Sequence, residues 1–120
     1  MGKGIFQIGV KYAVIGVIKG LTGNILTHFI VSGATIAAAY GLGITTAEWL
    51  WIIFCIIAVM AMEYMNTAVE QLCDHLHPER HPMIANVKDL AAGAVLITCI
   101  GAVVIGVIIF YPYVADLLIA

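Results

Sequence analysis

Four polar side chains recur along one apolar segment at spacings of three, four and four residues, namely Glu63, Asn66, Glu70 and Asp74. On an α-helix these spacings place all four on one face, with Thr67 beside them. At 1.5 Å per residue, the first and last lie about 16 Å apart along the helix axis. The segment therefore predicts a polar stripe that runs from inside an apolar layer toward its edge.

Glu63 is the deepest member of this stripe, because it follows fourteen residues without a charge. A carboxylate among hydrocarbon is costly unless it is paired, protonated or hydrated, so such a residue indicates a functional site. Desolvation makes it a better general base, and a second carboxylate nearer water, Glu70, can bind Mg²⁺. This combination suits phosphoryl transfer. A purely structural network of hydrogen bonds between helices is the alternative.

Apolar helices must position the stripe. Of the 120 residues, 63% are apolar and 10% are charged, whereas a soluble domain has about 25% charged residues. Charge-poor stretches predict three membrane-spanning helices over residues 25–41, 47–72 and 89–111. A soluble helical core is the alternative, but its surface would need polar residues that the sequence lacks. We expect one all-α integral membrane domain over residues 1–120.

The first 22 residues form a distinct amphipathic segment. Lys3, Lys11 and Lys19 recur every eight residues among apolar side chains, which places successive lysines about 80° apart around a helix. We predict an interfacial helix over residues 1–22, lying on an anionic membrane face. A helical extension of the first span is the alternative. The lysines interrupt the apolar run and no small-residue cleavage site follows, so no signal peptide is expected.

The distribution of basic residues predicts the orientation. All five lysine and arginine residues lie in the N-terminal segment or in the predicted loop over residues 74–88. Both regions are therefore expected on the cytoplasmic side. At the outer side, Thr45 and Thr46 before Glu48 supply an N-cap for the second span. Pro112 is expected to end the third span.

The predicted cytoplasmic loop carries further polar groups with two interpretations each. His75, His77 and His81 have a density that suits a metal cluster, or they are solvated loop residues. Lys88 and Asp89 could bind a ligand. Alternatively they only form the polar cap of the third span, because an acidic residue is favourable at a helix N-terminus.

Together these residues form a recognisable pattern that resembles the signature of the prokaryotic diacylglycerol kinase family. The resemblance runs from Trp49 to the C terminus and has three pieces: Glu63-x-x-Asn66-Thr67-Ala68-Val69-Glu70-x-x-x-Asp74, His81-Pro82, and Lys88-Asp89-x-Ala91-Ala92-Gly93-Ala94-Val95. The last piece, with the ending Ile108-Ile109-Phe110-Tyr111-Pro112, is more similar to the undecaprenol kinase branch.

The resemblance implies an ATP-dependent lipid kinase with Mg²⁺ as cofactor, acting on the hydroxyl of undecaprenol or diacylglycerol at the cytoplasmic interface. It implies a homotrimer in the bacterial inner membrane, multi-pass with a cytoplasmic N terminus. No nucleic-acid partner is expected.

The resemblance also assigns roles to residues. Glu63 would be the general base that binds the lipid hydroxyl, Asn66 would support it, and Glu70 would ligate the metal. Trp49 would lie near the lipid. The nucleotide would contact five residues: Glu79, Arg80, His81, Lys88 and Asp89.

The N-terminal part departs from the family pattern. The family has a glutamate there as second protein ligand of the metal, and without gaps this position is Thr22; with a two-residue shift it is Asn24. A hard cation prefers charged oxygen ligands, so one carboxylate fewer weakens Mg²⁺ binding. Two other functions therefore stay open: a catalytically degenerate scaffold that binds lipid or nucleotide, and an ion or proton conduit along the stripe.

Overall fold

Residues 2–120, the part that the computed structural model describes, form four α-helices joined by short connections. The helices are α1 (Gly2–Lys19), α2 (Gly23–Leu42), α3 (Thr46–Leu76) and α4 (Pro82–Ile119). Met1 and the side chains of Lys3 and Phe6 lie outside the description, and so does the predicted role of Lys3. The helices α2, α3 and α4 are long and apolar enough to cross a membrane. The predicted class, an all-α membrane protein with three spans, is confirmed.

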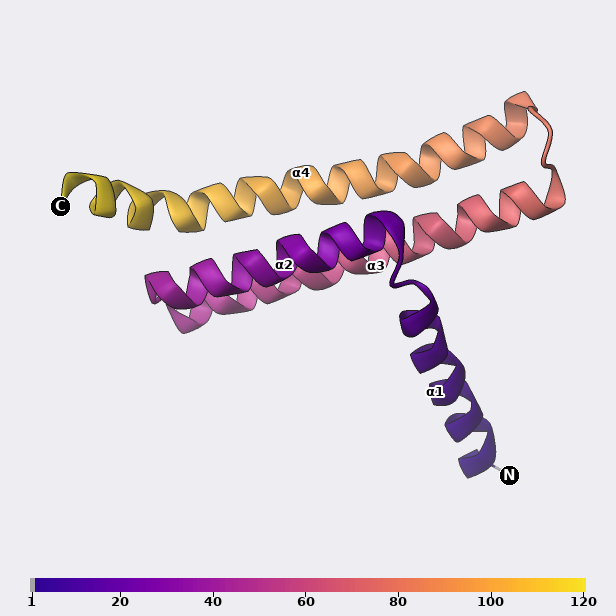
Figure 1. The fold of residues 1–120 in the computed structure, drawn as a ribbon, viewed down its shortest axis with the longest axis horizontal. Helices are drawn as coiled ribbons and strands as arrows, with labels where there is room; N and C mark the ends of the chain where they lie inside the picture. The colour runs from indigo at the N-terminus through magenta and orange to yellow at the C-terminus, as the bar shows by residue number, and fades with distance from the viewer. Residues whose placement is uncertain (1) are drawn as a thin grey trace.

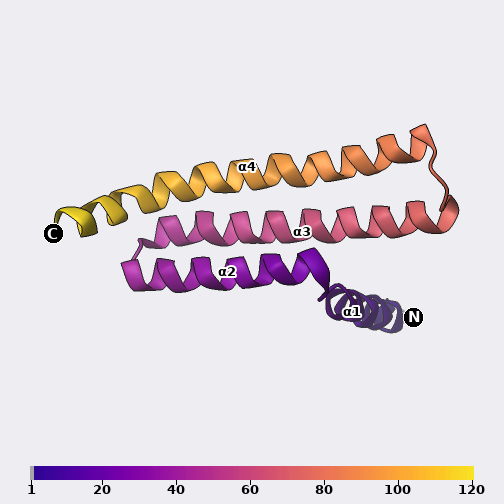
Figure 2. The same cartoon turned by 45° about the horizontal axis from the view of Figure 1, so that its top comes forward.

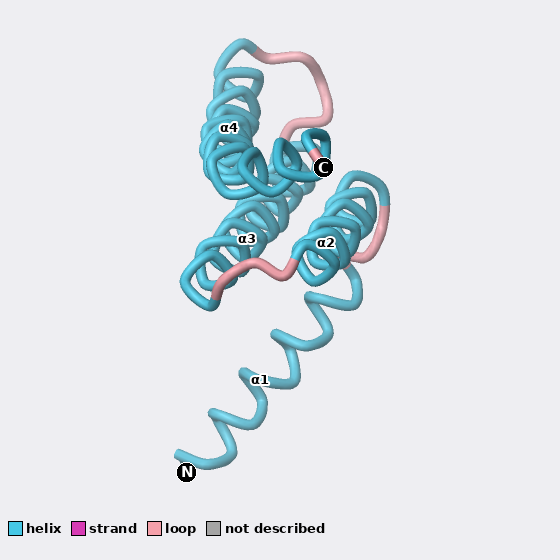
Figure 3. The backbone as a smooth tube through the Cα atoms, turned by 90° about the vertical axis from the view of Figure 1, so that its left-hand side faces the viewer, coloured by secondary structure: helices cyan, strands magenta, loops and turns pink. Residues whose placement is uncertain are grey.

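The three long helices form an antiparallel bundle in which α3 packs against both α2 and α4 (Figure 2). Helix α1 leaves this bundle at a steep angle, so its first residues as described lie far from the three long helices (Figures 1 and 3). The hydroxyl of Tyr64 donates to the Val17 carbonyl at 2.6 Å and ties the end of α1 to α3. A Cβ at Gly20 would collide with the same tyrosine ring, so this approach requires glycine. That α1 lies on a membrane surface stays a prediction.

A short turn joins α2 to α3. Gly43 ends α2 in the left-handed region with φ 66°, and its N–H bonds the carbonyls of Ala39 and Tyr40. Thr45 then caps α3: its hydroxyl accepts from the N–H of Glu48, whose carboxylate accepts from the N–H of Thr45. This capping box satisfies two backbone donors at the helix start and confirms the predicted N-cap.

The buried core lies at this same end of the bundle. It consists of Ala39, Ile44, Ile52 and Ile109, with half-buried side chains such as Trp49 packed around it. The Tyr113 hydroxyl donates to Glu48 Oε2 at 2.6 Å, which ties α4 to the capping box of α3. Most other apolar side chains of the bundle are exposed, as expected where lipid or another chain covers them.

The long helices differ in length, and this difference shapes the other end of the bundle. Helix α2 has 20 residues, about 30 Å, and α3 has 31 residues, about 46 Å at 1.5 Å per residue. Helix α2 ends and α3 begins at the same turn, and the two run antiparallel, so α3 extends past the beginning of α2. The last turns of α3 therefore have α4 as a neighbour but are not covered by α2.

The loop between α3 and α4 is shorter than predicted. It covers residues 77–81 rather than 74–88, because both helices extend into the predicted loop. His81 caps α4 by accepting from the N–H of Met83 at 3.1 Å, and Pro82 occupies the first turn, where no N–H is needed. Asp89 therefore lies two turns inside α4, so its interpretation as a helix cap is wrong.

The sequence predicted that Pro112 ends the third span, and this prediction is wrong. The helix continues through it to Ile119. Proline removes one backbone hydrogen bond, and neighbouring contacts in a membrane helix can compensate for this loss. Here the next residue, Tyr113, is fixed by its hydrogen bond to Glu48 and holds the following turn against α3.

We predict that Tyr113→Phe lowers the midpoint temperature of thermal unfolding in detergent by a few degrees. The substitution removes the Tyr113 hydroxyl that donates to the Glu48 carboxylate and leaves the ring in place. Tyr111→Phe is the matched control, because Tyr111 is exposed on the same helix. Equal midpoints for the two variants would show that the hydrogen bond from Tyr113 to Glu48 does not contribute to stability.

Candidate functional site

Glu63 is buried in the middle of the bundle and paired across helices. The residue is 7% exposed, and its Oε1 lies 2.8 Å from Nε2 of His28 on α2. Its second oxygen, Oε2, has no hydrogen-bond partner among the described residues. The structure thus leaves one oxygen of a desolvated carboxylate available for a ligand.

Asn66 lies one turn closer to the loop on the same face of α3. Its Nδ2 donates to Oε1 of Glu70 at 3.1 Å. Its Oδ1 is buried without a hydrogen-bond partner. Because an unpaired buried carbonyl oxygen carries a full desolvation cost, this oxygen is available to accept from a ligand or water or to bind an ion. Asn66 therefore contacts the predicted metal ligand, whereas His28 contacts the predicted base.

Asp74 ends the stripe in an ion pair with Lys88. The two side chains connect the last turn of α3 to the second turn of α4, with Asp74 exposed and Lys88 partly exposed. Lys88 thus lies at the loop end of the stripe. The Glu70 carboxylate is one turn along α3 from Asp74, the partner of Lys88. This arrangement keeps a cation next to the carboxylates at the open end of the site.

The five residues predicted to contact a nucleotide line one pocket. The pocket has a volume of about 250 Å³ and lies between the loop and the first turns of α4. Its lining includes all of Glu79, Arg80, His81, Lys88 and Asp89. These residues are up to ten positions apart in sequence, and the shortness of the loop brings them together.

Of the two interpretations of His75, His77 and His81, the metal cluster is not formed, because residues 2–120 as described contain no group of three possible ligands. The ring of His77 packs edge-on against that of His81, with centroids 5.2 Å apart. Nδ1 of His77 bonds the Glu79 carbonyl and Nδ1 of His81 caps α4. These two rings therefore shape the loop.

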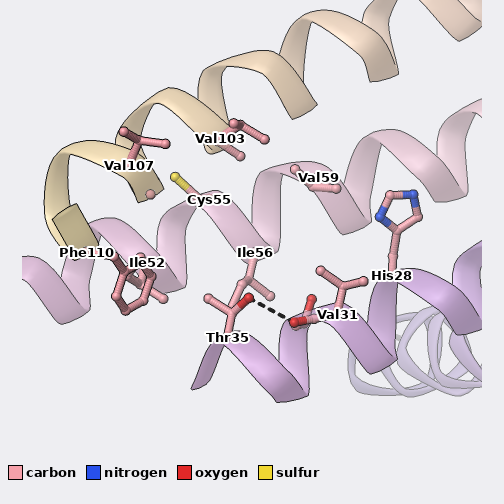
Figure 4. Close-up of a pocket in the computed structure, with 13 residues that line it drawn as sticks. His28, Val31, Thr35, Ile52, Cys55, Ile56, Val59, Val103, Val107 and Phe110 are labelled. Carbon is pink, nitrogen blue, oxygen red and sulfur yellow. Dashed lines mark hydrogen bonds between the residues drawn. The ribbon is translucent and has the colours of Figure 1, made fainter. Parts of the chain in front are cut away.

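An apolar groove begins at His28 and runs along α3 toward the outer turn (Figure 4). It has a volume of about 330 Å³ and is lined from all three long helices. His28 and Phe110 lie at its opposite ends, and Cys55, Val103 and Val107 lie along it (Figure 4). The residue that contacts Glu63 is therefore also part of the groove.

Three residues considered from sequence lie away from this constellation. Trp49 packs beside the core at the outer end of α3, fourteen residues or about 21 Å along the axis from Glu63. Thr22 is the N-cap of α2 but its side chain makes no capping bond. Asn24 is exposed at the start of the same helix. No hydrogen bond within the described chain joins either residue to Glu70.

The fold and the site define a class: a three-span helical membrane protein with a buried carboxylate connected by a polar stripe to a charged pocket at one end of the bundle. The chain belongs to the prokaryotic diacylglycerol kinase family, whose model matches residues 11–110. This family contains lipid kinases.

Two curated relatives support the assignment. An undecaprenol kinase of Bacillus subtilis is 30% identical over 89 residues, which cover 74% of this chain and 72% of the relative. A diacylglycerol kinase of Haemophilus influenzae is 36% identical over 77 residues, covering 63% of this chain and 65% of the relative. The family match includes the whole stripe, His28 and the loop pocket.

The pairing of His28 with Glu63 was not predicted from the sequence. A signal was available, because the two residues lie at comparable distances before and after the turn at residues 43–45. An antiparallel hairpin brings such positions to the same depth. The turn predicts depth but not the rotation of each helix, so the contact itself needed the structure.

We predict that Asp74→Asn lowers the unfolding midpoint in detergent by less than Tyr113→Phe does. Asp74 is exposed and Lys88 is partly exposed, and ion pairs in contact with water contribute little to stability and are screened by salt. Thermal unfolding at low and high salt measures this. A large, salt-independent loss would show that the pair holds α3 and α4 together, which would contradict its assignment to the ligand-binding end.

Proposed function

We propose that the protein is an ATP-dependent kinase that transfers the γ-phosphoryl group to the hydroxyl of a membrane lipid. One observation carries this proposal: Glu63 is buried, and its Oε2 has no partner among the described residues. Glu63 shares one face of α3 with Glu70 and Asp74. Asp74 in turn forms the ion pair with Lys88. A base, an oxygen ligand and a cation are thus aligned from the apolar interior to the open end of α3.

The reaction requires one base and an arrangement of charges. Oε2 of Glu63 accepts the proton of the lipid hydroxyl as the lipid oxygen bonds to the γ-phosphorus of ATP, and ADP leaves with the electron pair of the broken P–O bond. Lys88, released from Asp74 or shared with it, neutralises phosphate charge. The loop pocket with Glu79, Arg80 and His81 binds the remainder of the nucleotide.

Two oxygens on α3 fit a magnesium ion brought with the nucleotide. The carboxylate of Glu70 supplies the charged ligand, and the unpartnered Oδ1 of Asn66 supplies a neutral one after a small movement. Mg²⁺ commonly has only one or two carboxylate ligands and completes its shell with waters and phosphate oxygens. When bound, the ion supplies positive charge to the phosphates. Thr22 and Asn24 are not required as ligands in this arrangement.

The lipid approaches from the groove. Its hydroxyl lies at Glu63 and its chain follows the apolar lining toward Phe110, with Trp49 farther along the same direction. Undecaprenol and diacylglycerol are the two candidate substrates. ATP is a cytoplasmic compound, so the loop and the N terminus face the cytoplasm of a bacterium, across the inner membrane. We propose a homotrimer, which would cover part of the exposed apolar surface.

We predict that Glu63→Gln lowers kcat by about 10² to 10⁴, the usual contribution of a general base. The assay follows transfer of labelled phosphate from Mg-ATP to undecaprenol or to diacylglycerol, with purified protein in detergent. Asp116→Asn, at the outer end of α4, is the control and keeps full activity.

Absence of product with both lipids over a range of Mg²⁺ concentrations would contradict the kinase function and favour a catalytically degenerate relative. Full activity of the Glu63→Gln variant would contradict the role of Glu63 alone.

We predict that Glu70→Gln raises the Mg²⁺ concentration needed for half-maximal activity by about tenfold or more, because a neutral amide replaces the charged ligand. Activity should recover in part at high Mg²⁺, which distinguishes this variant from Glu63→Gln. An unchanged Mg²⁺ dependence would remove Glu70 from the metal site.

A further inference from the structure

We propose that His28 is a positioning residue for Glu63: it holds one carboxylate oxygen by a hydrogen bond from Nε2 and so directs the other oxygen toward the lipid hydroxyl at the inner end of the groove. This inference rests on the proposed kinase function. It concerns a residue on α2, whereas the residues assigned so far to proton transfer and metal binding lie on α3.

The geometry of the pair supports this role. Nε2 of His28 lies 2.8 Å from Oε1 of Glu63, and Oε2 has no partner among the described residues. An ionised carboxylate only accepts hydrogen bonds, so the hydrogen between the two atoms belongs to the histidine. The pair thus gives the two oxygens of one carboxylate different tasks.

No other described side chain performs this task. Asn66, one turn away on α3, donates to Glu70 instead of Glu63. A glutamate side chain has several rotatable bonds, and a free one would sample orientations in which neither oxygen faces the substrate. Because a displacement of about 1 Å can reduce a rate by about 10²-fold, one fixed oxygen has a large effect on turnover.

The position of His28 also links the two parts of the site. Its side chain lines the inner end of the apolar groove (Figure 4) and contacts the base. A lipid chain in the groove therefore passes the ring of His28 before its hydroxyl reaches Glu63. This places the acceptor oxygen of the base at the end of the path that an apolar chain can follow.

Three substitutions at one position test the proposal. His28→Gln places an amide donor near the former Nε2, His28→Asn places the same group too short to reach Glu63, and His28→Leu removes the donor. We expect kcat to fall by about 10- to 100-fold in the Asn and Leu variants. The KM values for lipid and ATP should stay within about twofold, since ground-state binding is retained. The Gln variant should recover most of the wild-type kcat.

Thr27→Val is the control, because Thr27 is the exposed neighbour of His28 on α2, and it should keep wild-type kinetics. Unfolding midpoints are measured for every variant. The Gln and Asn variants carry the same amide, so the comparison holds even if the Leu variant fails to fold. Equal kcat for Gln and Asn, or loss expressed only in KM, would overturn the positioning role while wild-type turnover upheld the kinase. No turnover by the wild-type protein would overturn both.

Discussion

A carboxylate inside an apolar bundle needs a partner, and the pairing of Glu63 with His28 is the constraint from which the rest of the site follows. The pair satisfies one oxygen of Glu63 and leaves the other without a partner in the described chain. It also fixes α2 against α3 at the depth where the apolar groove ends. Burial, charge and ligand access are thus combined at one contact.

The difference in length between α2 and α3 determines how this buried pair communicates with water. Helix α2 covers Glu63 but begins too late along the bundle to cover Glu70 and Asp74. The stripe is therefore covered at Glu63 and open at its loop end, where Lys88 and the loop pocket lie. A lipid and a nucleotide can approach such a site from different solvents and meet on one helix face.

The sequence predicted what depends on a single helix, and missed much of what depends on two. The three spans and the stripe from Glu63 to Asp74 follow from hydropathy and from 3.6-residue periodicity. The bounds of the loop and the continuation through Pro112 depended on His81 capping α4 and on Tyr113 contacting Glu48. The contact of His28 depended on how α2 is rotated, and uniformly apolar helix faces contain little information on rotation.

The central claim is that the nucleotide's metal binds on α3 beside Glu70, within reach of the base. It is tested most directly by adding Mn²⁺ with a non-hydrolysable ATP analogue to labelled protein and recording paramagnetic broadening of backbone amide signals. The account predicts the strongest broadening at Asn66 and Glu70, weaker broadening at Glu63 and none at Trp49, about 21 Å farther along the helix. Broadening confined to the histidine loop, with Asn66 and Glu70 unaffected, would contradict it.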